Sequence, residues 1–169
     1  RYNTLYRKIA CQKARLFPRV KNTLDRLKGC GYRLVIATNE SRANLDLLLE
    51  HFSIEHFFHA TCCADEVNRP KPFPDMGRKL LAETDTVGKR ALMVGDSLCD
   101  IEMAKQMSMH SCAVGWGGTD LGRLCNASPG WAVEAFPDIL DILAVQRTIS
   151  SVRYTLDCGR ENIAASLAL

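Results

Sequence analysis

The sequence predicts an α/β fold built on a doubly wound parallel sheet. Two short apolar runs rich in β-formers, "RLVIAT" at 33–38 and "ALMVG" at 91–95, indicate strands that are buried on both faces. Each run is followed by a segment whose apolar residues recur at helical spacing. Strands that alternate with helices along a chain are typical of this fold class, and 169 residues are enough for one domain with a sizeable core.

The first half of the chain predicts the elements in the following order. They are a basic helix over 2–16 that Pro18 ends, a helix over 20–28, the strand over 33–38, a helix that follows the turn 39–41 and ends near Phe52, and a strand over 56–61. Gly29 and Gly31 supply the end of the second helix and the turn into the strand.

The second half begins with the loop "NRPKPFPD" at 68–75, whose three prolines exclude a helix or a central strand. The expected elements after it are a helix over 75–83, the strand over 91–95, a helix over 98–107, a strand over 111–116, a short strand over 131–133 and a helix over 139–145. A glycine-rich loop spans Gly115 to Gly118. In the tail, 151–157 alternates weakly like a strand and 160–169 has a helical pattern.

The composition narrows the class of protein. Hydrophobic residues make up 47% and charged residues 24%, which is ordinary for a globular domain, and the net charge of +3 is too small to indicate a nucleic-acid partner. No apolar run approaches the ~20 residues of a membrane span, and no signal peptide opens the chain, so we expect a cytoplasmic location without a membrane partner. The eight cysteines are scattered without a C-x-x-C pair, which favours free buried thiols.

Two aspartates follow the strand "ALMVG" in the stretch "MVGDSLCD". Asp96 falls on the turn and Asp100 in the first turn of the next helix, so both can face one point. Neighbouring carboxylates repel unless a cation lies between them, and hard oxygen ligands suit Mg²⁺. Asp96 or Ser97 can equally be a helix cap, with Asp100 favoured by the helix dipole. The octapeptide alone leaves both interpretations open.

Two other polar features fall at strand ends or in loops. Thr38 and Asn39 end the strand over 33–38, where a hydroxyl and backbone N–H groups can bind an anion. Lys71 lies in the proline-rich loop, where it can neutralise a phosphate as a point charge. Separately, Thr38 could be a cap and Lys71 a solvated surface residue. Because functional loops gather at the carboxyl ends of parallel strands, the residues together predict a magnesium-assisted phosphate site.

Three motifs carry a resemblance to a known family. "VIATN", "RPKPFPD" and "MVGDSLCDIEMA" resemble motifs two, three and four of the haloacid dehalogenase superfamily, in the order and spacing of its phosphoglycolate phosphatase-like branch. "FPRVKNTLDRLKGCGYRL" and "CAVGWGG" are similar to that branch as well, so the resemblance covers about 17–145. It implies a Rossmannoid hydrolase core over 17–146, a remnant of a cap-domain helix over 1–16, and a tail over 147–169 to which it assigns no structure.

The resemblance also implies roles for the five polar residues. Thr38 and the backbone of Asn39 would bind the transferring phosphoryl group, Lys71 would bind the same phosphate, and Asp96 and Asp100 would hold Mg²⁺ directly or through water. The implied reaction is hydrolysis of a small phosphomonoester metabolite, similar to phosphoglycolate, through an aspartyl-phosphate.

The sequence departs from the family at the nucleophile. The expected D-x-D-G-T motif does not occur in the 169 residues, and its nearest echo, "YTLDCG" at 154–159, has Thr155 where the nucleophile belongs. We therefore expect this chain alone to be inactive. A catalytically inactive remnant or binding module that keeps phosphate and Mg²⁺ binding is the alternative function. A signalling receiver domain is disfavoured because its acids precede its threonine and lysine.

The missing motif also affects the expected sheet. In the family the nucleophile strand lies between the strands that here are 33–38 and 91–95. The candidate replacement, 151–157, alternates where a central strand should be continuously apolar, and it would bury Arg153. We therefore expect the tail not to fill this position, and the sheet to be incomplete at the N-terminus.

Overall fold

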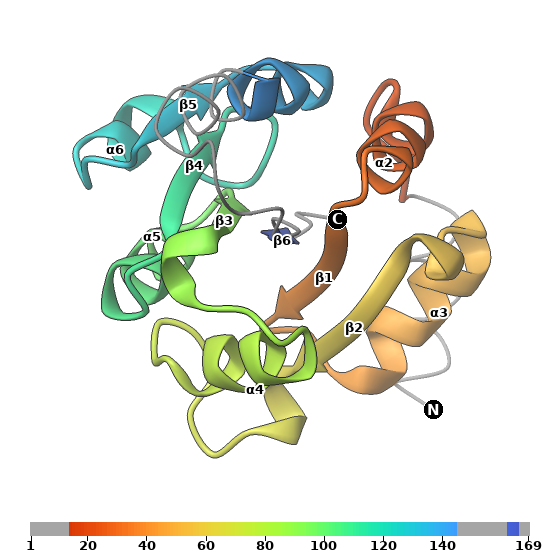
Figure 1. Cartoon of the computed structure of the whole chain (residues 1–169), viewed down its shortest axis with the longest axis horizontal. Helices are drawn as coiled ribbons and strands as arrows, with labels where there is room; N and C mark the ends of the chain where they lie inside the picture. Colours follow the sequence, from red (N-terminus) through yellow and green to blue (C-terminus); the bar gives the residue numbers. More distant parts are fainter. Residues whose placement is uncertain (1–13, 145–161, 166–169) are drawn as a thin grey trace, which may run out of the picture.

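The structure, a computed structural model, describes residues 14–144 and 162–165. It contains a six-stranded sheet in the order β2-β1-β6-β3-β4-β5, and each pair of neighbouring strands is parallel (Figure 1). The strands are β1 (Arg33–Thr38), β2 (Phe58–Cys63), β3 (Ala91–Gly95), β4 (His110–Val114), β5 (Trp131–Val133) and β6 (Asn162–Ala165). The predicted α/β class with a doubly wound parallel sheet is confirmed.

Helices alternate with these strands as expected. They are α2 (Val20–Gly29), α3 (Arg42–Phe52), α4 (Asp75–Glu83), α5 (Leu98–Gln106), α6 (Leu121–Cys125) and a helix that includes residues 139–144. Single 3₁₀ turns occupy Glu55–Phe57, Ala64–Glu66, Gly88–Arg90 and Phe136–Asp138. The helix expected over 2–16 lies almost wholly outside the described residues.

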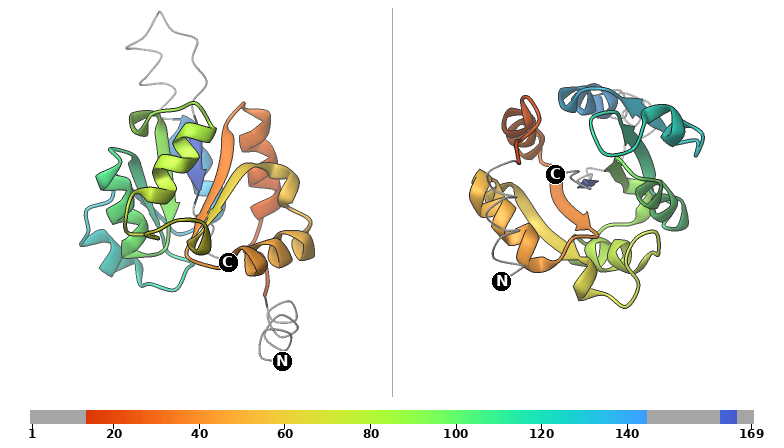
Figure 2. Two further views of the ribbon diagram at one scale, coloured as in Figure 1. Left: turned by 90° about the horizontal axis from the view of Figure 1, so that it is seen from below. Right: turned by 180° about the vertical axis from the view of Figure 1, so that it is seen from behind.

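The helices cover both faces of the sheet (Figure 2). Alternate residues of β1 face opposite layers: Leu34 and Ile36 pack with α2, α3 and the helix at 139–144, whereas Val35 and Ala37 pack with α4 and α5. β3 is buried along its whole length. This two-sided burial explains why the sequences of β1 and β3 are apolar without alternation.

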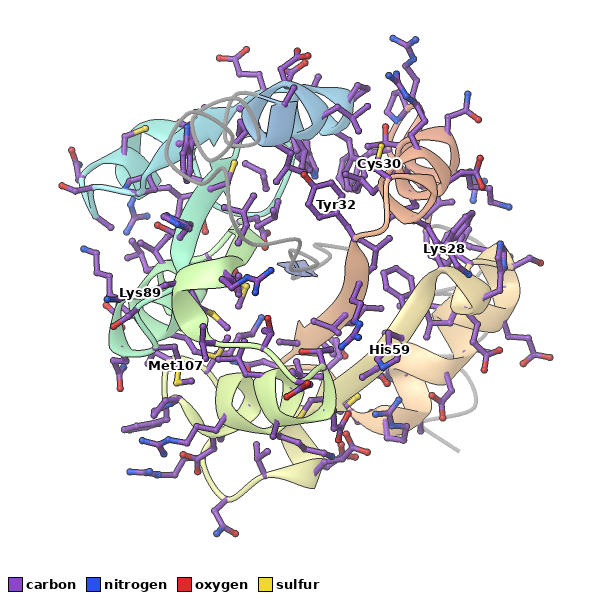
Figure 3. The ribbon with its side chains drawn as sticks, viewed as in Figure 1. Lys28, Cys30, Tyr32, His59, Lys89 and Met107 are labelled. Carbon is purple, nitrogen blue, oxygen red and sulfur yellow. The ribbon has the colours of Figure 1, made fainter. Side chains whose placement is uncertain are left out.

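The C-terminal end of α2 is attached to the turn that precedes β2. The Lys28 ammonium group donates a hydrogen bond to the carbonyl oxygen of His56 at 2.5 Å, which connects α2 to the 3₁₀ turn before β2. Figure 3 shows Tyr32, a residue that is 6% exposed, on the inner side of α2, and Lys89 on the outer rim.

The bounds of β2 and β4 differ from the prediction at both ends, those of β2 by two residues at each end and those of β4 by one residue at its start and two at its end. β2 begins at Phe58 and not at residue 56, because Glu55–Phe57 forms a 3₁₀ turn. β4 ends at Val114, and Gly115 already belongs to the following loop, where its N–H donates to the carbonyl of Val133 in β5 at 2.9 Å. The predicted strand runs to Trp116 because that residue continues the apolar run, whereas the glycine-rich loop predicted from Gly115 onward marks the observed end.

The largest correction concerns the tail. Residues 162–165 form strand β6 between β1 and β3 (Figure 1). The helical prediction over 160–169 is therefore wrong at these residues. The expectation that the tail leaves this position of the sheet open is wrong as well. Ile163 is in register with Leu34 of β1 and Leu92 of β3. Buried backbone groups without partners cost about 1–3 kcal/mol each, and β6 supplies partners to both flanking strands. The segment 151–157 lies outside the described residues.

The thiols of the described region are free. Cys62, Cys63 and Cys112 are buried, as predicted, whereas Cys30 and Cys125 are exposed. Burial raises the pKa of Cys63 to about 11 and that of Cys112 to about 12, so both thiols stay protonated near neutral pH and act as packing groups. Among residues 14–144 and 162–165, no helix has the length and apolar character to cross a bilayer.

A backbone change in β6 tests its place in the sheet. Ala164 pairs with Val35 and Met93, so Ala164→Pro removes a ladder N–H from a central strand. We expect the free energy of unfolding in urea to fall by about 1–3 kcal/mol. Ala164→Ser keeps the N–H and is the matched control. Equal unfolding curves for the two variants would mean that 162–165 contributes nothing to the folded sheet.

Candidate functional site

The polar residues gather at the topological switch point of the sheet. The chain proceeds from β1 to β2 on one side of β6 and from β3 to β4 on the other. In open α/β sheets, ligands bind at the carboxyl ends of the strands at such a point. Thr38 ends β1, Asp96 directly follows β3, and the loop between β2 and α4 carries Lys71.

Lys71 is a buried cation, not a surface charge. Its Nζ donates to Asp100 Oδ1 at 2.6 Å and to the carbonyl oxygen of Ala37 at 2.7 Å. The side chains of Lys71 and Asp100 are 5% and 1% exposed. Lys71 therefore connects the end of β1 to the first turn of α5, on either side of the β6 position. The structure thus brings Lys71 and Asp100 together, whereas their predicted roles as phosphate and metal ligands stay predictions.

The loop that carries Lys71 is fixed at two points that the sequence did not predict. The Asn39 side chain accepts from the Lys71 backbone N–H at 3.1 Å and donates to the Lys71 carbonyl at 3.0 Å. Gln106, at the end of α5, donates to the Pro72 carbonyl at 2.9 Å. Asn39 thus holds Lys71 through its side chain, and the phosphate-binding role of its backbone stays a prediction.

Asp100 belongs to a helix cap as well as to the ion pair. Ser97 is the N-cap of α5, and its backbone N–H and hydroxyl both donate to Asp100 Oδ2, at 3.0 and 2.7 Å. The capping interpretation is therefore correct for Ser97 and Asp100. A Cβ on Gly95 would lie 2.4 Å from the Cβ of Asp100, so glycine is required at this close approach. Both carboxylate oxygens of Asp100 already accept hydrogen bonds.

Asp96 is held by the neighbouring glycine-rich loop. Its Oδ2 accepts the backbone N–H of Gly118 at 2.7 Å. A Cβ on Gly117 would lie 2.0 Å from the Cβ of Asp96, so this loop approaches the carboxylate as closely as the backbone allows. Asp96 is half-buried, and within the described residues its hydrogen bond from Gly118 reaches Oδ2 and not Oδ1. The glycine-rich loop that the sequence predicted lies beside Asp96, and its role as a hydrogen-bond donor was not predicted.

Thr38 lies at the turn into α3. Its Oγ1 accepts the N–H of Glu40 at 3.1 Å, which leaves the hydroxyl proton to donate elsewhere. Ser41 caps α3 by accepting the N–H of Asn44 at 3.4 Å. The capping role that was the alternative for Thr38 therefore falls to Ser41, and the Thr38 hydroxyl is half-buried at the carboxyl end of β1.

The donor set limits the kind of metal that the site can take. Among the described residues, no group of three or more His, Cys, Asp and Glu side chains is placed to enclose a metal ion. Mg²⁺ commonly keeps several waters and binds one or two carboxylates together with phosphate oxygens. A single carboxylate such as Asp96 at the carboxyl ends of the strands fits this kind of coordination, whereas a closed cage of protein ligands does not.

Comparison with known proteins agrees with this geometry. The family model described as "Haloacid dehalogenase-like hydrolase" matches residues 1–114. The protein "Probable phosphatase IndB" of Dickeya dadantii is 35% identical over 125 residues, which are 74% of this chain and 54% of that protein. A phosphoglycolate phosphatase of Aliivibrio fischeri is 32% identical over 136 residues, or 80% of this chain and 60% of the relative.

A solved structure is similar as well. The crystal structure of a predicted phosphoglycolate phosphatase from Haemophilus somnus matches with a TM-score of 0.80 at 30% identity, over 84% of this chain and 63% of that one. The chain thus spans less than two thirds of the length of these relatives. With the family model matched and the strand ends arranged as described, the chain belongs to the haloacid dehalogenase-like hydrolase family, on its phosphoglycolate phosphatase-like branch.

Proposed function

We propose that this chain provides the phosphate- and magnesium-binding part of a phosphomonoester hydrolase. The substrate class is a small phosphorylated metabolite similar to phosphoglycolate, and relatives named as phosphatases support this class. The observation that carries the proposal is the buried cation of Lys71, fixed by Asp100 and Ala37 at the switch point of the sheet. Neither a nucleic-acid nor a membrane partner is part of the proposal, and the cytoplasmic location remains a prediction from the sequence.

The phosphate would bind where β1, β3 and the Lys71 loop meet. The Thr38 hydroxyl and the backbone N–H of Asn39 would donate to phosphoryl oxygens at the turn after β1. Lys71 would add a positive charge that the surrounding protein shields only weakly, because the pair lies away from solvent. This arrangement orients the phosphoryl group toward the end of the strand between β1 and β3.

Asp96 would be the direct protein ligand of Mg²⁺, because its Oδ1 is available while Gly118 fixes its Oδ2. Asp100, whose oxygens accept from Lys71 and Ser97, would reach the ion through water. When bound, the ion would neutralise charge that develops on the phosphoryl group.

One observation favours a second candidate, a binding module without turnover. Hydrolysis through an aspartyl-phosphate needs a carboxylate at the end of the strand between β1 and β3. In this structure Asn162–Ala165 occupies that strand position, and these four residues include no carboxylate. Phosphate and Mg²⁺ binding would persist without the covalent step.

Lys71→Ala tests the phosphate role. We expect the affinity for phosphate or vanadate, measured by calorimetry, to fall about tenfold or more, because a charge-assisted hydrogen bond contributes about 1.5–3 kcal/mol. The same change leaves Asp100 buried without its cation, so stability should fall by about 3–5 kcal/mol.

Two controls separate these effects. Lys71→Met with Asp100→Asn removes both charges, and the amide oxygen can still accept from Ser97, so this variant should recover part of the stability without recovering phosphate affinity. Lys79→Ala removes a lysine from the half-exposed pair with Glu66 and should change neither property. Phosphate affinity that is indifferent to Lys71→Ala would exclude Lys71 as a ligand.

Asp96→Asn tests the metal role. The amide keeps the size of the side chain and an acceptor for Gly118, but it loses the charge. We expect Mg²⁺ affinity in calorimetry to fall about tenfold, and to fall further than in Asp100→Asn, which should mainly lower the melting temperature. Unchanged Mg²⁺ affinity in Asp96→Asn would remove Asp96 from the metal site.

Turnover separates the two candidate functions. With Mg²⁺ and an aryl phosphate, we expect this chain to show little or no hydrolysis, because no carboxylate nucleophile occupies the central strand. Metal-dependent hydrolysis faster than about 1 s⁻¹ in a contaminant-free preparation, a rate typical of enzymes, would contradict this expectation. The Asp96→Asn protein, purified in parallel, is the control for contaminating phosphatase.

A further inference from the structure

The loop that contacts Asp96 is anchored by an aromatic cluster. Trp116 is half-buried, and its ring lies 6.3 Å from that of Phe17 and 5.6 Å from that of Phe136, measured between centroids. Phe17 precedes α2 and Phe136 begins the 3₁₀ turn after β5, so the cluster joins segments from distant parts of the chain. The Trp116 ring packs against the larger of the two main cores, the one beneath α2 and α3.

The loop is also fixed at both ends. The Gly115 N–H donates to the Val133 carbonyl at 2.9 Å, and Asp120 accepts the N–H of Arg123 at 3.1 Å as the cap of α6. Between these anchors, Gly118 directs its N–H at Asp96 Oδ2 from 2.7 Å. Gly118 is two residues from Trp116, a separation of at most about 7 Å along an extended backbone. Because so few residues separate them, a displacement of Trp116 should also displace the backbone of Gly118.

We propose that Trp116 is a positioning residue for Asp96. Its ring fixes the loop whose Gly118 amide holds one carboxylate oxygen and directs the other toward the cation. The inference rests on the proposed function for the metal-binding role of Asp96. Binding constellations work when side chains are held within about 0.5 Å of the productive geometry, and a single hydrogen bond from a mobile loop does not give that precision.

The direct test follows the Gly118 amide by NMR hydrogen exchange without metal. We expect Trp116→Ala to accelerate exchange at Gly118 about tenfold or more relative to core amides of β3, and Trp116→Phe to restore much of the protection. Phe52→Ala is the matched control, because Phe52 is a partly buried aromatic residue on the same core that ends α3 at the opposite edge of the sheet. It should leave the Gly118 amide unchanged.

Mg²⁺ titration by calorimetry supplies the second readout. Gly118→Pro removes the N–H donor, and we expect it to weaken Mg²⁺ binding several-fold, as Trp116→Ala does. If Trp116 acts through Gly118, the double variant should bind Mg²⁺ no more weakly than either single variant, whereas independent effects would add.

Two exchange results would overturn the inference: Gly118 exchange that is unchanged in Trp116→Ala, or a rise that is equal at Gly118 and in the core strands, which would mark a purely structural role. Additive losses of Mg²⁺ affinity would overturn it as well. A wild-type chain that fails to bind Mg²⁺ would instead contradict the proposed function, while the exchange data would still decide whether Trp116 positions Asp96.

Discussion

The ammonium group of Lys71 is the constraint on which the rest of the site depends. A lysine withdrawn from water is stable only when its charge and its donors are matched, and here Asp100 and the Ala37 carbonyl supply the partners. Ala37 belongs to β1, Asp100 to α5, and Lys71 to the loop before α4. One buried group thus fixes the relative positions of three segments that are distant in sequence.

The same requirement explains several local features. Asp100 can serve Lys71 because Ser97 holds its other oxygen and because Gly95 leaves room for its side chain. The Asn39 side chain bonds both the N–H and the carbonyl oxygen of Lys71. The loop therefore cannot rotate away without breaking two hydrogen bonds. The phosphate site proposed at this point is therefore rigid before any ligand arrives, which reduces the cost of binding.

Much of this could be predicted from the sequence, because it depends on local pattern. The uninterrupted apolar runs of β1 and β3 specified buried parallel strands, and the chemistry of Lys71, Asp96 and Asp100 indicated a site at their ends. The contacts made by Asn39 and Gly118 could not be predicted in the same way, since each joins residues more than twenty positions apart and neither residue type marks its partner. Strand β6 was missed for a related reason: the segment 160–169 has a helical pattern by itself, and only pairing with β1 and β3 makes residues 162–165 a strand.

We infer that the strand ends around Lys71 form one phosphate site. A crystal structure of the chain with Mg²⁺ and vanadate tests this inference most directly. We expect a vanadate whose oxygens lie within hydrogen-bond distance of Thr38 Oγ1 and Lys71 Nζ, with Mg²⁺ bound to Asp96 Oδ1. Vanadate bound elsewhere on the chain, or a site in which Thr38 and Lys71 make no contact with the anion at saturating concentration, would contradict it.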